Sequence, residues 1–206
     1  MQASLPTSPQ APSLGRPLIL GSTSRYRREL LERLRLPFQT LSPDVDETPL
    51  PGETPLDLSL RLARAKAQAV ATLHPQAVVI GSDQVPELDG QPLSKPGDHE
   101  RATEQLHLMS GRQMRFHTAV SVVCLETGFA QTDVVTVQVR FRALGDAEIE
   151  RDLRAEQPYD CAGSAKSEGL GISLLDAIVS DDPTALIGLP LIRTCQLLRA
   201  AGAVLP

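Results

Sequence analysis

Short, fully apolar runs alternate along the chain with longer segments whose apolar residues have helical spacing. Leu18-Ile19-Leu20 and Ala77-Val78-Val79-Ile80 are typical of buried strands. The segment 56–73 places its apolar residues on one side of a helix, at Leu60, Ala63, Ala67 and Val70. The pattern therefore predicts strands and helices in alternation.

Two longer β runs follow, over residues 117–125 and 131–141, with Thr127-Gly128 between them. The second run alternates apolar and polar residues, so one of its faces is expected to be buried. This predicts a mixed α/β fold with at least one long antiparallel pair. The other expected elements are a helix after Ser24, a hairpin at 88–93, helices at 98–110, 146–156 and 190–201, and a strand at 172–174.

Three segments are expected to lack regular structure. Residues 1–15 are rich in Pro, Ser, Ala and Gln, which predicts a disordered tail before one domain over residues 16–206. Residues 43–55 contain four prolines and read as a loop. Residues 161–171 are rich in small residues, a composition typical of a functional loop.

Charge and composition exclude several classes of protein. The formal net charge is −5, whereas proteins that bind nucleic acid polymers usually carry a basic excess. No run approaches the ~20 apolar residues that span a bilayer, and the first residues do not resemble a signal peptide. Three widely spaced cysteines, Cys124, Cys161 and Cys195, match neither a disulfide framework nor a zinc site. We therefore expect a cytoplasmic protein with buried thiols and no membrane contact.

The first segment with candidate chemistry runs from Gly21 to Arg28. A strand ends there, a turn of small residues follows, and a helix begins. A helix N-terminus offers free N–H groups and partial positive charge, and Ser22 and Arg27 add a hydroxyl and a guanidinium suited to phosphate. The alternative is a capped amphipathic helix with a solvated basic face.

A second segment, Gly81-Ser82-Asp83-Gln84, follows the second apolar run. Ligands of α/β sheets gather beyond the carboxyl ends of strands, and we expect Asp83 to lie directly after its strand. There it could bind a metal ion or take a proton from water. The alternative is an Asp that caps a turn.

Other polar residues are candidates for the same site only if the fold brings them close to Asp83. Glu47 lies in an acidic loop, Lys66 on the expected second helix and Lys95 in Leu93-Ser94-Lys95-Pro96. Lys166 and Glu168 lie on the small-residue loop. Taken alone, Glu47, Lys66 and Lys95 are better read as solvated surface residues, and residues 161–171 equally well as a plain loop.

Read in order, these segments resemble the Maf family of nucleotide pyrophosphatases, over essentially the whole chain from residue 17. The resemblance is carried by Ser22-Thr23-Ser24 with Arg27-Arg28, Val45-Asp46-Glu47-Thr48-Pro49, Ala63-Arg64-Ala65-Lys66-Ala67, Gly81-Ser82-Asp83-Gln84, Lys95-Pro96, Ala162-Gly163-Ser164-Ala165-Lys166-Ser167-Glu168-Gly169 and Gly188-Leu189-Pro190. Each motif is weak alone, but their order and spacing together are specific.

The resemblance implies a fold, a reaction and a partner. The fold is a strongly bent mixed sheet flanked by helices in two lobes around a central cleft, as in Maf and ITPase-like proteins. The reaction is hydrolysis of a nucleoside triphosphate between its α- and β-phosphates, with a divalent cation such as Mg²⁺ or Mn²⁺. A homodimer is also implied.

The resemblance also implies residue roles. Asp83 resembles the general base and Glu47 a metal-site acid, with Asp83 as a second metal ligand. The residues that resemble the phosphate-facing set are Ser22, Arg27, Lys66, Lys95 and Lys166, of which Lys66 and Lys95 are also expected to act in catalysis.

Gln84 and the Ser-Glu-Gly sequence at Glu168 resemble the branch of the family that acts on 7-methyl-GTP, with Tyr26 at the position of a large aromatic residue. A methylated guanine is cationic and would be attracted to the Tyr26 ring. Two alternatives remain: a dTTP or UTP pyrophosphatase of the same family, and a nucleotide-binding regulator without turnover.

Overall fold

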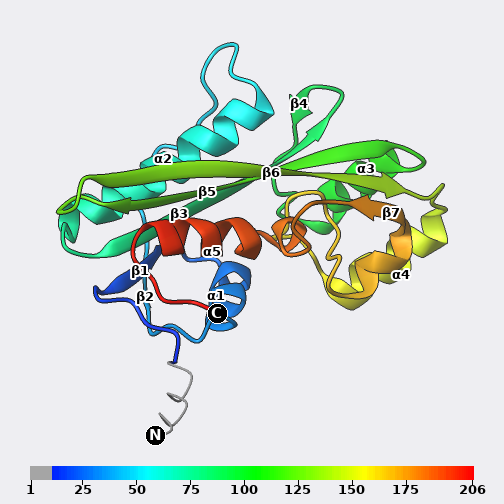
Figure 1. Ribbon diagram of the computed structural model, residues 1–206. Helices are drawn as coiled ribbons and strands as arrows, with labels where there is room; N and C mark the ends of the chain where they lie inside the picture. Colours follow the sequence, from blue (N-terminus) through cyan, green and yellow to red (C-terminus); the bar gives the residue numbers. More distant parts are fainter. Residues whose placement is uncertain (1–10) are drawn as a thin grey trace, which may run out of the picture.

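The computed structural model describes residues 11–206, which form a seven-stranded mixed sheet with helices on both faces (Figure 1). The strands are β1 (Leu18–Gly21), β2 (Gln39–Leu41), β3 (Val78–Leu88), β4 (Gln91–Pro92), β5 (Gln113–Cys124), β6 (Phe129–Phe141) and β7 (Leu175–Val179). The helices are α1 (Arg25–Glu32), α2 (Pro55–Leu73), α3 (His99–Met109), α4 (Asp146–Glu156) and α5 (Leu191–Ala200), with 3₁₀ turns η1 (Leu170–Leu174) and η2 (Ala185–Ile187). The predicted α/β class is confirmed.

Long strands β3, β5 and β6 run through two lobes (Figure 1). In the first lobe, β1 pairs in parallel with both β2 and β3, while α1 and α5 cover one face and α2 the other. In the second lobe, α3 and α4 pack on β5 and β6 around a separate core that includes Phe116 and Val137. Strand β5 contributes Val120 and Val122 to the first core and Met114 and Phe116 to the second, all from the same face, so the length of the strand allows it to serve both cores. The two expected lobes are confirmed.

One edge of β3 changes partner along its length. Parallel pairing with β1 ends at Gly21 opposite Gly81, and antiparallel pairing with β4 begins only at Glu87. Residues 82–86 therefore have β5 on one side and, within residues 11–206, no strand on the other. This gap leaves the polar sequence Ser82-Asp83-Gln84 without a strand neighbour on that edge.

The structure corrects two expectations about strands. Asp83 does not follow its strand but lies within β3, because pairing with β5 continues past the point where β1 ends. The expected strand at 172–174 is wrong, since η1 occupies it and β7 follows. A Cβ at Gly171 would lie 2.7 Å from the Lys166 amide nitrogen. Because glycine has no Cβ, this segment can pack closely against its own loop.

Other elements agree with the sequence, apart from their ends. The β5 strand begins at Gln113, four residues before the expected 117, and the short strand β2 was not anticipated. The predicted hairpin joins β3 to β4 through Asp89 and Gly90, both with positive φ, as a type I′ hairpin turn requires.

The N-terminal expectation falls partly outside the described residues, which begin at 11. Ser13 forms an antiparallel bridge with Val204, and Leu14 packs against the core of the first lobe. These two residues are attached to the fold, so the expected tail stays a prediction only for the residues before them. Within residues 11–206, no helix is both long and apolar enough to cross a membrane. Cys124 is buried, Cys161 and Cys195 are half-buried, and all three are free thiols.

Helix α2 approaches β3 unusually closely at Gly81. A Cβ added there would lie 2.3 Å from the Ala63 carbonyl oxygen and 2.4 Å from the Ala67 amide nitrogen. Both atoms belong to helix backbone and cannot rotate away. Only glycine therefore allows this contact, and the small Ala63 and Ala67 side chains, both fully buried, serve the same close packing.

We predict that Gly81→Ala lowers the free energy of unfolding by about 3 kcal/mol, because the helix must move off the sheet to admit the methyl group. Urea unfolding followed by circular dichroism measures the change. Gly15→Ala is the matched control, since a Cβ at Gly15 meets no atom within 4 Å. Equal stability of the two variants would contradict the close-approach argument.

Candidate active site

A cleft of about 940 Å³ opens at the gap along the edge of β3. The start of α1, the loop before α2, α2 itself, the β4 hairpin and the segment after Tyr159 enclose it. Its polar and charged lining includes Ser22, Ser24, Arg25, Tyr26, Arg27, Glu47, Lys66, Asp83, Gln84, Lys95 and Asp160.

Lys66 forms the centre of the cleft floor. Its side chain is 7 % exposed, and its Nζ lies 2.7 Å from Asp83 Oδ1 and 2.6 Å from Glu47 Oε1. Lys66 lies on α2 between Ala63 and Ala67, and Asp83 lies two residues beyond Gly81, so the close approach described above brings these groups together. A buried ammonium paired with two carboxylates satisfies the requirement that buried charges be compensated.

Glu47 is held in its ionised form. Partial burial would raise its pKa, but the Lys66 hydrogen bond and the charges of Lys66, Lys95 and Arg27 outweigh burial and lower the pKa below 4.5. The cleft therefore holds an ionised carboxylate among cations at neutral pH.

Polar contacts fix the turn that leads into α1. Ser22 Oγ accepts a hydrogen bond from the Ser24 amide at 3.1 Å, and Ser24 caps the helix. Arg27 Nε donates to the Gly188 carbonyl at 2.8 Å, while its Nη1 lies 3.5 Å from Ser22 Oγ. Burial lowers the pKa of Arg27 and the charges of Asp83 and Glu47 oppose this, but an arginine remains charged. The arrangement presents a cation and helix N–H groups to an anion.

A smaller pocket of about 110 Å³ adjoins the cleft. It shares Tyr26, Arg27, Gln84 and Lys95 with the cleft and adds Phe116, Lys166 and Glu168. The charged cleft therefore lies beside a smaller pocket whose lining is both apolar and polar.

Gln84 links two elements of the protein at this pocket. Its Nε2 donates to Thr118 Oγ1 at 2.9 Å and to the carbonyls of Ala185 and Leu186, each at 3.0 Å. No donor in the described chain contacts its Oε1. The side chain is therefore available to a ligand as an acceptor, not as a donor.

Tyr26 forms a polar group with residues of the 160–162 segment. Its hydroxyl accepts from Arg25 at 2.7 Å and lies 3.3 Å from an Asp160 carboxylate oxygen, and the Arg25 guanidinium lies 4.7 Å from the ring centroid. Burial raises the pKa of Tyr26, so the phenol stays neutral. One face of its ring is thus already in contact with a cation.

Comparison with known proteins identifies the family. The model of the family described as Maf-like protein matches residues 17–201. The chain belongs to the Maf family. It is 67% identical over 190 residues to the 7-methyl-GTP pyrophosphatase of Polaromonas sp., an alignment that covers 92% of this chain and 87% of the relative.

Two further relatives bear the same description. The protein from Albidiferax ferrireducens is 67% identical, covering 91% of this chain and 94% of the relative. The protein from Bordetella pertussis is 60% identical, covering 93% of this chain and 95% of the relative. The resemblance found in the sequence is thereby confirmed at the level of the family.

The fold brings most of the expected site residues of this Maf protein into one place. Those that line the large cleft are Ser22, Tyr26, Arg27, Glu47, Lys66, Asp83, Gln84 and Lys95. Lys166 and Glu168 line only the smaller pocket. Lys166 Nζ donates to the Glu156 carbonyl at 3.0 Å, at the end of α4, so it does not join the cations around Lys66. The exposed Glu168 carboxylate accepts a hydrogen bond from Ser167 Oγ at 3.5 Å.

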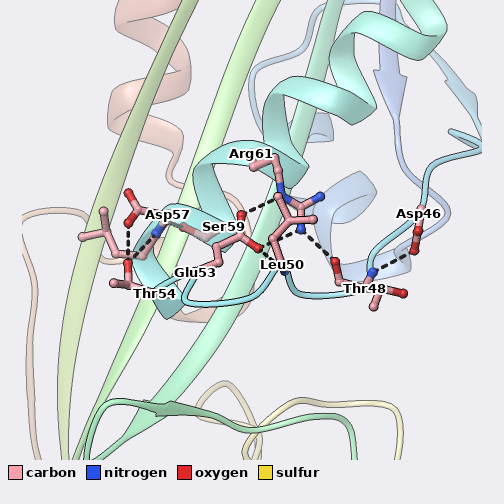
Figure 2. A network of polar contacts seen from close by, with 9 residues as sticks. Asp46, Thr48, Leu50, Glu53, Thr54, Asp57, Ser59 and Arg61 are labelled. Carbon is pink, nitrogen blue, oxygen red and sulfur yellow. Dashed lines mark hydrogen bonds and ion pairs between the residues drawn. The ribbon is translucent and has the colours of Figure 1, made fainter.

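Two features of the site were missed in the sequence. Asp160 lines both hollows but lies two residues before the recognised motif, which begins at Ala162. Glu53 and Arg61 form an ion pair beside the loop that carries Glu47 (Figure 2). They lie eight residues apart in the sequence. Because Glu53 precedes α2 and Arg61 lies on it, no regular helical or strand pattern covers both residues and predicts that they meet. The only signal in the sequence was that Glu53 and Arg61 carry opposite charges.

We predict that Lys66→Met raises the pKa of Glu47 relative to the wild-type protein, because burial then acts without its main opposing charge. As the pH falls, the Glu47 carboxylate should therefore become protonated at a lower pH in the wild-type protein than in the variant. Carbon-detected NMR titration of the Glu47 carboxyl measures both. Lys95→Met is the control, with a smaller expected rise. An unchanged Glu47 pKa in Lys66→Met would show that the ion pair does not form in solution.

Proposed function

We propose that this Maf protein hydrolyses 7-methyl-GTP to 7-methyl-GMP and pyrophosphate. Relatives with 60% to 67% identity carry the description 7-methyl-GTP pyrophosphatase. The supporting observation in the structure is the buried Lys66 that holds Glu47 and Asp83 together beneath a cleft rich in cations. The proposal places the reaction in the cytoplasm and retains the homodimer that the family resemblance implies.

The triphosphate is proposed to lie along the cation-rich side of the cleft. Ser22, Arg27 and the free N–H groups of α1 face it from one side, and Lys95 faces it from the β4 hairpin. These groups stabilise the negative charge that develops on phosphate oxygens when the anhydride bond breaks. The fixed position of Arg27 against Gly188 means that little reorganisation is needed.

Asp83 is proposed to be the general base. Lys66 occupies its Oδ1, which leaves Oδ2 to accept a proton from water. The water oxygen bonds to a phosphorus of the α–β anhydride, the bridging P–O bond breaks, and its electrons remain with the departing phosphate. One water molecule is consumed for each nucleoside monophosphate and pyrophosphate released.

A divalent cation fits this site as a companion of the substrate. Residues 11–206 contain no group of three or more His, Cys, Asp or Glu side chains that could hold a metal ion alone. Mg²⁺ commonly uses one or two carboxylates together with substrate phosphates, which is what Glu47 and Asp83 could offer. When bound, Mg²⁺ or Mn²⁺ would neutralise phosphate charge.

The smaller pocket is proposed to hold the base. Guanine presents N–H donors on its Watson–Crick edge, and both Gln84 Oε1 and the Glu168 carboxylate are acceptors. Methylation makes the base cationic, which favours contact with the face of Tyr26 that Arg25 leaves open and with the Asp160 carboxylate beside it. Lys166 is proposed to face the nucleotide from the same pocket.

A nucleotide panel tests this function. We predict that kcat/KM for 7-methyl-GTP exceeds that for GTP, dTTP and UTP by about tenfold or more, and that hydrolysis stops in excess chelator. Tyr26→Ala and Glu168→Gln are expected to reduce the ratio of kcat/KM for 7-methyl-GTP to that for the other nucleotides. Glu29→Gln, at an exposed position on α1, is expected to leave this ratio unchanged. Preference for dTTP or UTP would support another branch of the family, and tight binding without turnover would support a regulator.

We predict that Asp83→Asn reduces kcat by at least about 100-fold, because the amide cannot take the proton. The fold should survive, since the amide keeps the shape and Lys66 retains Glu47 as a partner. Pyrophosphate release measures activity, and the melting temperature checks the fold. Asp44→Asn, on the exposed part of the same cleft-side loop as Glu47, is the control. A variant that kept a tenth of wild-type kcat would remove Asp83 from this role.

A further inference from the structure

Glu47 lies in a loop without regular structure, yet its carboxylate has a defined partner. Residues 42–50 form neither helix nor strand, and the Glu47 side chain is 61% exposed. An ion pair with so exposed a member contributes little by itself to fixing a loop. Other contacts must therefore place Glu47 within 2.6 Å of Lys66.

Arg61 supplies these contacts from α2 (Figure 2). Its Nε lies 2.6 Å from Glu53 Oε1, and its Nη2 lies 2.9 Å from Glu53 Oε2. The same Nη2 donates to the Thr48 carbonyl at 3.0 Å, directly after Glu47. Glu53 in turn accepts a hydrogen bond from the Leu50 amide at 3.0 Å. One guanidinium thus ties two points of the loop to the helix.

The fork geometry of Arg61 matters because it fixes direction as well as distance. A two-point pair with a carboxylate defines the plane of the guanidinium, which a lysine ammonium cannot do. The Glu53 side chain is only 8% exposed, and the Arg61 hydrogen bond lowers the pKa of Glu53 to about 2. The pair therefore stays ionised across the working pH range.

Helix α2 carries both ends of this arrangement. Arg61 holds the loop, and Lys66, five residues later, holds the Glu47 carboxylate. The Gly81 contact fixes the same helix against β3, where Asp83 lies. The relative position of Glu47, Lys66 and Asp83 is thus set by one rigid element.

We propose that Arg61, paired with Glu53, is a positioning residue that holds Glu47 beside Lys66 and Asp83. This rests on the proposed function for its role in the reaction, but not for its role in ordering the loop. Arg61 does not line the cleft, so it acts through Glu47 and not on the substrate.

The ordering role is tested without any nucleotide. Amide hydrogen exchange of the segment 43–54, followed by mass spectrometry, is expected to become about tenfold faster in Arg61→Ala, because the loop opens more often. Arg64→Ala is the matched control, since Arg64 lies exposed on the same helix. Unchanged exchange in Arg61→Ala would overturn the proposal.

The role in the reaction is tested by a double-mutant cycle with Glu47→Gln. Arg61→Ala is expected to lower kcat/KM about tenfold in the wild-type background and less than twofold in the Glu47→Gln background, because misplacing an absent carboxylate costs nothing. Arg61→Lys should recover only part of the loss, and melting temperatures confirm that each variant folds. Equal losses in both backgrounds would show that Arg61 acts independently of Glu47 and would overturn the proposal.

The two experiments separate failure of the inference from failure of the proposed function. If the wild-type protein hydrolyses none of the nucleotides tested, the proposed function fails, and hydrogen exchange still decides whether Arg61 orders the loop. If hydrolysis occurs but the losses are additive, the function stands and the positioning role is wrong.

Discussion

The contact of α2 with β3 at Gly81 is the constraint on which the site depends. Backbone meets backbone there, with no room for a Cβ, so the helix has one position on the sheet. Lys66 lies on the same turn of α2, directly before Ala67, and Asp83 lies two residues along β3. A displaced helix would separate the buried ammonium from its carboxylate partners and leave charges uncompensated, which is costly in the interior. The same contact thus sets packing and electrostatics together.

The cleft itself follows from how the sheet is paired. Strand β3 loses β1 at Gly81 and gains β4 at Glu87, while β5 supports it throughout. An interrupted edge gives access to side chains on both faces of one strand, so Asp83 on the α2 side and Gln84 on the other can serve a single ligand. This accounts for a charged cleft and a smaller pocket that share one strand.

Cations and acids in the site stabilise one another before any substrate binds. Lys66 is paired with two carboxylates, and Arg27 is fixed by the Gly188 carbonyl while Asp83 and Glu47 favour its charged form. Arg61 extends this order to a loop that has no regular structure of its own. Preorganised charges of this kind are what transfer of a phosphoryl group requires, since the protein contributes mainly position and electrostatic stabilisation.

Features that depend on neighbouring residues could be predicted from the amino-acid sequence. The helical spacing of α2, the helix expected at 98–110 and the hairpin expected at 88–93 are local features, and each was predicted. Motif order also indicated the family and most of the cleft-lining residues. Three features could be read only from the three-dimensional fold: Asp83 lies inside a strand, Lys166 contacts the end of α4, and Arg61 contacts the loop of Glu47. Each of these depends on a partner distant in the chain, and no local pattern of hydrophobic and polar residues records which distant segments will meet.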